Sequence, residues 1–385
     1  MAEIEYDLVV VGAGVLGTFH AYHAIKKGLK VALVEKDSTP RRASVLNFGQ
    51  VVPSGMNTKW QAYGRNSLQI YKDIQSKLDI SVRQEGTLYL ASNEEEVQLL
   101  EELSRINKAN DYPSVLLTKT ACLNRCPGLN RNYVKAGLFF PEEITIEPHT
   151  MVRRVHHFLE KMGLHLWNSA HVIACNPFGN RVMVQIADGR SFIASKTIIC
   201  NGSDFKTLYP KLFAASDLEI AKLQMLRTKP QFNYRLPGSI LSGLSIRRYE
   251  AFAECPSYSM IKTKEAPDSL EKRWGVHILF KQAIDGSVIL GDSHVYADVA
   301  HMDTLGFDLN MEIDDFMLAR AKEIFQLPTY EIQQRWCGMY SQCKNSDIFQ
   351  SNVDSNIHIV TGIGGKGMTA SAGFANHNIK LLFNY

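Results

Sequence analysis

The chain has 385 residues, of which 45% are hydrophobic and 21% are charged, and its formal net charge is +3. These values exclude collagenous and disordered proteins and are typical of a globular chain with a sizeable core. The length suits two domains, or one large domain with a lobe. No block of five like charges occurs, and the small positive excess argues neither for nor against nucleic acid; no nucleic acid partner is expected.

The cysteines and the first apolar segment bear on the compartment. Seven cysteines, an odd number without paired spacing, favour free thiols in a reducing compartment. The first residues are acidic where a signal peptide would be basic. The apolar run from Leu8 to Phe19 is too short to span a bilayer. We therefore expect a cytoplasmic protein without a transmembrane segment.

The first forty residues follow the order strand, glycine turn, helix, strand, acid. Tyr6 to Val11 is continuously apolar, which is typical of a strand buried on both faces of a parallel sheet. Gly12 to Gly17 follows as a G-x-G-x-x-G turn that leads into a helical stretch. The next apolar strand, Val31 to Val34, ends at Glu35. This order predicts a dinucleotide-binding unit.

Each residue of this fingerprint has a physical role. Gly12 permits the tight turn, Gly14 lets a pyrophosphate approach the backbone, and Gly17 lets the helix pack closely on the strand. The helix N-terminus offers free N–H groups to the phosphates. Glu35 is placed to accept hydrogen bonds from a ribose hydroxyl.

Two later segments bear on the type of dinucleotide. A polar loop from Arg41 to Gly49 follows the acidic strand. Near the other end of the chain, a predicted strand leads into the glycine-rich turn Gly362 to Thr369 and then a helix. This turn lacks the Lys-Ser/Thr end of a P-loop, which disfavours nucleotide hydrolysis. Its helix N-terminus suits negative charge, such as that of a reduced flavin.

Four motifs resemble the FAD-dependent amine and amino-acid oxidoreductases of the D-amino-acid oxidase, glycine oxidase and sarcosine oxidase superfamily. They are the first fingerprint with Glu35, the loop Ala43 to Gly49, the strand Lys196 to Gly202 and the turn Gly362 to Thr369. The resemblance covers nearly the whole chain and implies FAD as the cofactor. The cofactor-binding residues expected from the two glycine turns and the resemblance are Gly12, Gly14, Val15, Leu16, Gly17, Glu35, Lys36, Ser44, Asn47, Gly49, Val172, Asn201, Gly202, Gly338, Gly362, Gly364, Gly365, Lys366, Gly367, Met368 and Thr369.

Other segments are similar to one branch of that superfamily, proposed to oxidise aminophosphonates related to 2-aminoethylphosphonate. They are Leu223 to Thr228, Arg247 to Ser257, Leu290 to His294 and Arg335 to Tyr340. The chain departs from the branch at Cys337, where histidine is common, and at Lys281, where a smaller residue is expected. The resemblance implies a small anionic amine as the substrate.

The predicted fold is α/β, with two domains interleaved along the chain. A discontinuous Rossmann-like FAD-binding domain is expected from residues 1–85, 146–215 and 331–385. Residues 86–145 and 216–330 are expected to form an α+β substrate domain with a mostly antiparallel sheet, because 216–330 shows repeated period-two strands. A helix from about Asp314 to Phe325 is expected to cover that sheet.

Three predicted strands of the substrate domain each present a polar face, suited to the floor of an anion-binding pocket. The faces are Ser245, Arg247 and Tyr249; His277 and Lys281; and Asp292, His294 and Tyr296. The catalytic residues predicted from them and from the resemblance are Arg247, Tyr249, His277 and Tyr340. Arg247 is the first choice for the anion, because its guanidinium offers paired donors. A structural ion pair for Arg247 and packing roles for the others stay open.

The chemistry expected is hydride transfer from the amine-bearing carbon to flavin N5, followed by hydrolysis of the imine. The cofactor performs this step, so no protein nucleophile or metal is required. A glycine or sarcosine oxidase, a non-catalytic flavin scaffold and, less favoured, a nicotinamide-dependent dehydrogenase are alternatives. The electron acceptor, whether oxygen, a quinone or a protein, is left open. Cys337 and Cys343 flank a segment that resembles a flavin-contacting strand, but noncovalent flavin is expected.

Overall fold

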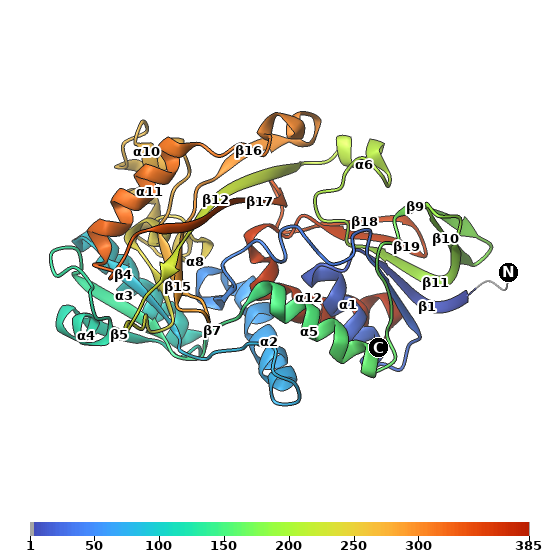
Figure 1. Ribbon diagram of the computed structural model, residues 1–385, viewed down its shortest axis with the longest axis horizontal. Helices are drawn as coiled ribbons and strands as arrows, with labels where there is room; N and C mark the ends of the chain where they lie inside the picture. The colour runs from blue at the N-terminus through green and yellow to red at the C-terminus, as the bar shows by residue number, and fades with distance from the viewer. Residues whose placement is uncertain (1–3, 385) are drawn as a thin grey trace.

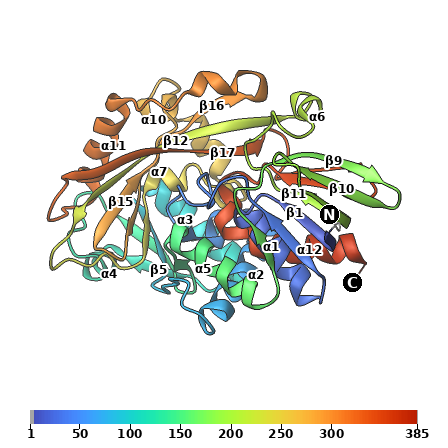
Figure 2. The same cartoon turned by 45° about the vertical axis from the view of Figure 1, so that its right-hand side comes forward.

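The computed structural model describes residues 4–384, and two large β-sheets organise them (Figure 1). The N-terminal residues 1–3, part of the acidic segment discussed above, lie outside the described residues. The described ends of the chain both lie beside the first sheet (Figures 1 and 2). Within residues 4–384, no helix is both long enough and apolar enough to cross a membrane.

The first sheet combines strands that lie far apart in the sequence. Its central strands β19, β11, β1, β2 and β8 run parallel, with the hairpin of β9 and β10 beside β11 and with β18 antiparallel at the edge. Their bounds are β1 Ile4–Val11, β2 Val31–Val34, β8 His165–Trp167, β9 Val172–Phe178, β10 Arg181–Ile186, β11 Ser191–Ile199, β18 Phe349–Asp354 and β19 Ile357–Thr361.

Both faces of strand β1 are buried, as its apolar run predicted. Leu8 and Val10 point into a core shared with four helices, whereas Val9 and Val11 join a second core beneath the hairpin. The four helices are α1 Val15–Lys26, α2 Thr58–Gln75, α5 Pro148–Lys161 and α12 Gly367–Phe383. Helix α12 packs against both α1 and α2, so segments near both ends of the chain contribute to the same core (Figure 2).

The second sheet is mostly antiparallel and follows the order β16-β12-β15-β14-β13-β4-β6-β5, with β17 also paired to β12. Its strands are β4 Thr87–Ala91, β5 Val115–Thr118, β6 Ala136–Phe140, β12 Leu218–Pro230, β13 Ser239–Leu241, β14 Leu279–Gln282, β15 Ser287–Gly291, β16 Val295–Asp298 and β17 Ile332–Cys343. Together the two sheets confirm the predicted α/β fold. The division into domains stays a prediction, and the C-terminal segment supplies strands to both sheets.

Helices cover both faces of the second sheet. Helix α11, Met311–Ile324, packs on one face, as predicted for residues 314–325, and α3, Glu94–Ala109, packs on the other. The remaining helices are short: α4 Lys119–Arg125, α6 Pro210–Ala214, α7 Gly243–Ile246, α8 Glu250–Ala253, α9 Tyr258–Thr263 and α10 Leu270–Arg273. A two-stranded sheet, β3 Gln50–Val51 with β7 Ile144–Thr145, and three 3-10 turns, Pro53–Gly55, Val299–Leu305 and Gly364–Lys366, complete the fold.

The strand predicted over residues 244–249 is wrong, because this segment forms helix α7 and a turn. A β-carbon at Gly243 would lie 2.1 Å from the Glu96 carboxylate, so glycine lets α7 begin directly against α3. Backbone bonds from Arg247 N–H to Gly243 O and from Tyr249 N–H to Ser245 O then hold the helical turn. Alternation of side chains therefore does not apply here.

Candidate functional site

A cavity of about 700 Å³ lies where the two sheets meet. On one side it is lined by the segments that follow the carboxyl ends of β1, β2, β11 and β19. On the other side it is lined by residues of the second sheet, including Leu279 and Gly338. The carboxyl ends of parallel strands are where α/β folds bind their ligands, and this volume is typical of a ligand site.

The first glycine turn forms one wall and has no room for side chains. Gly12 has φ +98°, and a β-carbon there would lie 2.3 Å from Cys200 O. At Gly14 it would lie 2.7 Å from Ser44 Oγ. Gly17 lies outside the cavity lining, and a β-carbon there would meet Gly12 O at 1.9 Å. Gly17 therefore allows the helix to pack closely. At Gly12 and Gly14 the wall of the cavity consists of backbone atoms, which a ligand can approach.

Glu35 fastens this turn to the end of β2. Its carboxylate is buried and accepts hydrogen bonds from Ala13 N–H at 3.0 Å and from Asp37 N–H at 3.1 Å. The acidic residue expected to face a ribose therefore also holds the glycine turn in shape.

Hydrogen bonds from its own side chains hold the shape of the loop after β2, residues 41–49. Ser44 Oγ accepts a hydrogen bond from Val15 N–H, and Asn47 bonds to Ala43 O and Gly49 N–H. After β11, Asn201 Oδ1 is buried without a hydrogen-bond partner among the described residues, and Asn201 lines the cavity. A bound polar group would satisfy this acceptor, as the hydroxyls of a dinucleotide can.

The second glycine turn places the N-terminus of α12 at the cavity. Gly362 and Gly364 have φ +68° and +65°, and the long helix α12 begins at Gly367. Its dipole favours negative charge at this point. Lys366 Nζ lies 2.7 Å from Glu250 Oε1, across the cavity rim.

The cavity lining includes all the predicted cofactor residues except Gly17. They are Gly12, Gly14, Val15, Leu16, Glu35, Lys36, Ser44, Asn47, Gly49, Val172, Asn201, Gly202, Gly338, Gly362, Gly364, Gly365, Lys366, Gly367, Met368 and Thr369. The glycine walls, the unpartnered Asn201 oxygen and the helix N-terminus fit FAD. Cys337 and Cys343 lie outside the lining, and noncovalent attachment stays a prediction.

At the far end of the cavity, the predicted catalytic residues Tyr249, His277 and Tyr340 come together, but Arg247 does not. Arg247 turns toward α3, where Nε lies 2.9 Å from Glu96 Oε1 and Nη2 lies 3.0 Å from Glu95 Oε2. This ion pair follows from the helical turn described above, and it is the structural alternative to the anion role expected for Arg247.

Arg248, for which the sequence predicted no role, lines the cavity instead. Its Nη2 donates a hydrogen bond to Tyr296 Oη at 2.7 Å. Among residues 4–384, no carboxylate lies within ion-pair distance of its guanidinium. A half-buried guanidinium with free donors is suited to an anionic ligand.

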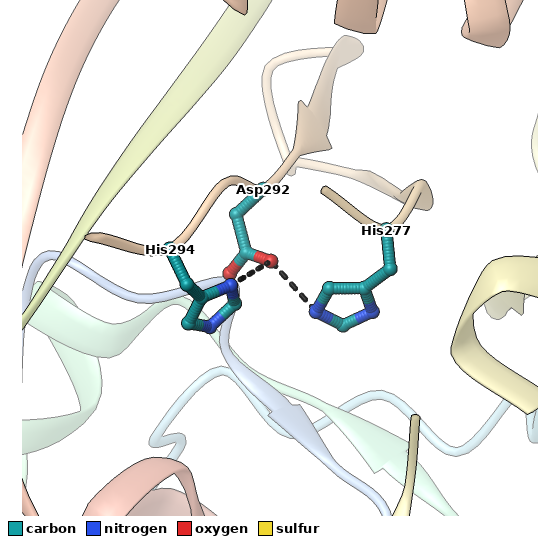
Figure 3. Close-up of side chains that lie close together, drawn as sticks. All are labelled: His277, Asp292 and His294. Atoms are coloured by element: carbon teal, nitrogen blue, oxygen red, sulfur yellow. Dashed lines mark ion pairs between the residues drawn. The ribbon is translucent and has the colours of Figure 1, made fainter. Parts of the chain in front are cut away.

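His277, Asp292 and His294 form a buried cluster at the same end (Figure 3). Two backbone hydrogen bonds, from His277 N–H to Asp292 O and from His294 N–H to Trp274 O, continue the antiparallel pairing of β14 and β15. They fix the position of the cluster. Asp292 Oδ1 lies 2.7 Å from His277 Nε2 and 3.8 Å from His294 Nδ1 (Figure 3). The sequence placed Asp292 and His294 on one polar face, but their proximity to His277 depends on strand register.

The protonation states at this end differ from those in water. Burial lowers the pKa of His294 to about 3, so its ring is neutral. Burial alone would raise the pKa of Asp292, but His294, His277 and Arg248 outweigh it and hold that pKa below its usual value. Burial raises the pKa of Tyr249 and Tyr340 above the usual value, so both phenols stay protonated.

Lys281, which shared a predicted face with His277, lies outside the cavity lining. Its Nζ donates to Ile146 O and lies 3.1 Å from Glu147 Oε1. Burial lowers its pKa to about 8. Its partners are structural, so we assign it no contact with a ligand.

Fold and cavity together define a dinucleotide-binding flavoprotein of the oxidoreductase class. The family model described as DAO, FAD dependent oxidoreductase, matches residues 7–378. The chain belongs to this family, and FAD is its cofactor.

Known proteins of this kind are similar over nearly the whole chain. Glycerol 3-phosphate dehydrogenase of Caloramator mitchellensis is 22% identical over 392 residues, covering 98% of this chain and 74% of its own. Glycine oxidase from Geobacillus kaustophilus has a TM-score of 0.79 at 15% identity, with 99% of this chain and 95% of that chain covered. L-alpha-glycerophosphate oxidase from Mycoplasma pneumoniae with FAD bound has a TM-score of 0.78 at 19% identity, covering 99% and 95%.

Proposed function

We propose that this FAD-dependent oxidoreductase oxidises the C–N bond of a small amine that carries an anionic group. The observation that carries the proposal is Arg248, a guanidinium without a carboxylate partner among the described residues, which lines the same cavity as the two glycine turns. The similarity to glycine oxidase supports an amine as the group oxidised.

Within this class we propose an aminophosphonate related to 2-aminoethylphosphonate. Support comes from the segments that resemble the aminophosphonate branch, among them Arg247 to Ser257, which contains Arg248. A phosphonate offers three oxygens and up to two negative charges to a fork of N–H donors. A glycine- or sarcosine-type amino acid is the second candidate, because a carboxylate also pairs with arginine.

FAD, held by the residues of the two glycine turns, supplies a hydride acceptor at its N5. Arg248 binds the anionic end and orients the amine-bearing carbon, which is the main contribution the protein makes. Tyr249 and Tyr340 line the site and limit the access of water to it. The N-terminus of α12 stabilises negative charge at that end of the cofactor site. The imine product reacts with water to give an aldehyde and ammonia, or methylamine from an N-methyl substrate.

Anaerobic reduction of the flavin tests this function without knowledge of the electron acceptor. The panel contains 2-aminoethylphosphonate, its N-methyl form, glycine and sarcosine. We expect the flavin absorbance to bleach faster with an aminophosphonate than with either amino acid. Faster bleaching by glycine or sarcosine would select the second candidate. A flavin that is photoreduced but bleached by none of the four would favour a non-catalytic scaffold. Cytoplasmic location stays a prediction from the sequence.

A further inference from the structure

Asp292 gives the cavity a negative charge that an anion-binding site alone does not need. It is buried, and no described lysine or arginine forms an ion pair with its carboxylate. His277 Nε2 lies 2.7 Å from Oδ1 and His294 Nδ1 lies 3.8 Å from it (Figure 3). A buried ionised carboxylate is costly unless a group of opposite charge pairs with it.

The neighbouring groups meet this requirement only in part, since their charges lower the pKa of Asp292 but no described lysine or arginine is paired with it. His294 Nδ1 lies 3.0 Å from Gly275 O, a contact that requires a proton on Nδ1. The neutral ring therefore has its lone pair on Nε2, which points away from the carboxylate (Figure 3). Arg248 donates a side-chain hydrogen bond to Tyr296 and, among the hydrogen bonds of residues 4–384, none to Asp292.

A divalent metal ion fits this cluster less well than an organic cation. The three side chains offer ligand atoms within 4.8 Å of one another. Coordination by His294 Nδ1 would require loss of the bond to Gly275 O and of the proton that makes it. Ammonium N–H groups need no such change, because they donate directly to the carboxylate.

We propose that Asp292 binds the protonated amino group of the substrate while Arg248 binds its anionic end. The substrate class is therefore a zwitterion. Asp292 selects it over an alcohol with the same anion, because a hydroxyl carries no charge to neutralise the buried carboxylate. This inference rests on the proposed function and names the residue that recognises the amine.

The experiment measures binding by the change in flavin absorbance of the FAD-loaded protein. The ligands are 2-aminoethylphosphonate, titrated anaerobically, and ethylphosphonate, which has the same anion without the amine. In Asp292→Asn we expect the half-saturating concentration of 2-aminoethylphosphonate to rise about 30-fold or more. The dissociation constant of ethylphosphonate should change less than about threefold, since Arg248 is intact.

Two further variants serve as controls. Asp292→Glu keeps the charge and should recover part of the affinity for the amine. Asp188→Asn removes an exposed carboxylate paired with Arg190 on the hairpin turn after β10 and should leave both ligands unaffected. Arg248→Gln should show the opposite pattern to Asp292→Asn, with loss of ethylphosphonate binding.

Equal weakening of both ligands in Asp292→Asn would overturn the inference and assign Asp292 a structural role. Unchanged binding of 2-aminoethylphosphonate would overturn it as well, as would wild-type protein that binds neither ligand. Failure of the proposed function is a separate result. It appears as wild-type flavin that no amine reduces, while titration of the two ligands still reports whether Asp292 distinguishes the amine.

Discussion

Arg247 and Arg248 are adjacent in the chain and have opposite surroundings. Arg247 is held by Glu95 and Glu96 on the first turns of α3, whereas Arg248 faces the cavity without a carboxylate partner among the described residues. A sequence pattern does not distinguish them, because the difference arises from the helical turn of α7.

The two arginines should therefore respond differently to the same substitution. In Arg248→Gln we expect kcat/KM for 2-aminoethylphosphonate to fall about 100-fold or more, through loss of a charged partner of the anion. For an amine without an anionic group, such as propylamine, kcat/KM should fall much less. In Arg247→Gln we expect the free energy of unfolding to fall by roughly 2 kcal/mol with KM nearly unchanged. Steady-state kinetics and thermal unfolding measure both, and the reverse pattern would return the anion role to Arg247.

Glu143 makes the stability of the protein depend on pH. Its carboxyl group is buried, accepts bonds from Ser54 N–H at 2.7 Å and from Tyr112 Oη at 3.0 Å, and has an unpartnered Oε2. Burial raises its pKa from 4.5 to about 7. The folded state thus holds a proton at Glu143 that the unfolded state releases between these two values, and stability falls as pH rises through this range.

Glu143→Gln should remove this pH dependence. We expect the contribution of Glu143 to the free energy of unfolding to decrease by about 3 kcal/mol from pH 4.5 to pH 7. This decrease should be absent in the variant, because glutamine does not titrate. Thermal unfolding of both proteins is measured across this pH range. The difference in unfolding free energy between wild type and variant at each pH isolates the contribution of Glu143. Parallel curves for the two proteins would show that Glu143 titrates normally.

At the scale of elements, the first glycine turn is the part of the cofactor site most sensitive to a single carbon atom. Gly12→Ala would place a β-carbon 2.3 Å from Cys200 O, at φ +98°. We expect the purified protein to lose its yellow colour, because the turn must move away from the position that faces the dinucleotide. Absorbance near the flavin bands, relative to protein concentration, is the measurement.

Gly28→Ala is the matched control for this substitution. Gly28 also has positive φ, at +80°, but a β-carbon there has no atom within 4 Å. The variant carries similar backbone strain without the contact, so it should retain flavin. Equal loss of flavin in both variants would attribute the effect to strain rather than to the shape of the turn.

The elements that the sequence predicted are those whose signal is local. Strand β1, the first glycine turn and α11 follow from apolar runs, glycine spacing and helical periodicity. The segment 244–249 was predicted wrongly because Gly243 and Glu96, which are far apart in the chain, determine its helical turn. Asp292 and His294 were placed on one face, but only the pairing of β14 with β15 brings His277 to them.

At the scale of the whole molecule, the cavity depends on four parallel strands drawn from both ends and the middle of the chain. Their carboxyl ends meet at one edge, and the second sheet closes the space together with the turn after α7, which carries Arg248, and the loop after β15, which carries Asp292. The cofactor end could be predicted because its motifs are contiguous. The substrate end could not be predicted in full, because it depends on contacts between segments.

The central claim is that this flavoprotein oxidises an anionic amine. The most direct test is anaerobic mixing of the FAD-loaded protein with 2-aminoethylphosphonate while the flavin absorbance is followed. We expect bleaching that saturates with the amine and yields one carbonyl product per flavin reduced. A flavin that dithionite or light reduces, but that this amine, its N-methyl form, glycine and sarcosine all leave oxidised, would contradict it.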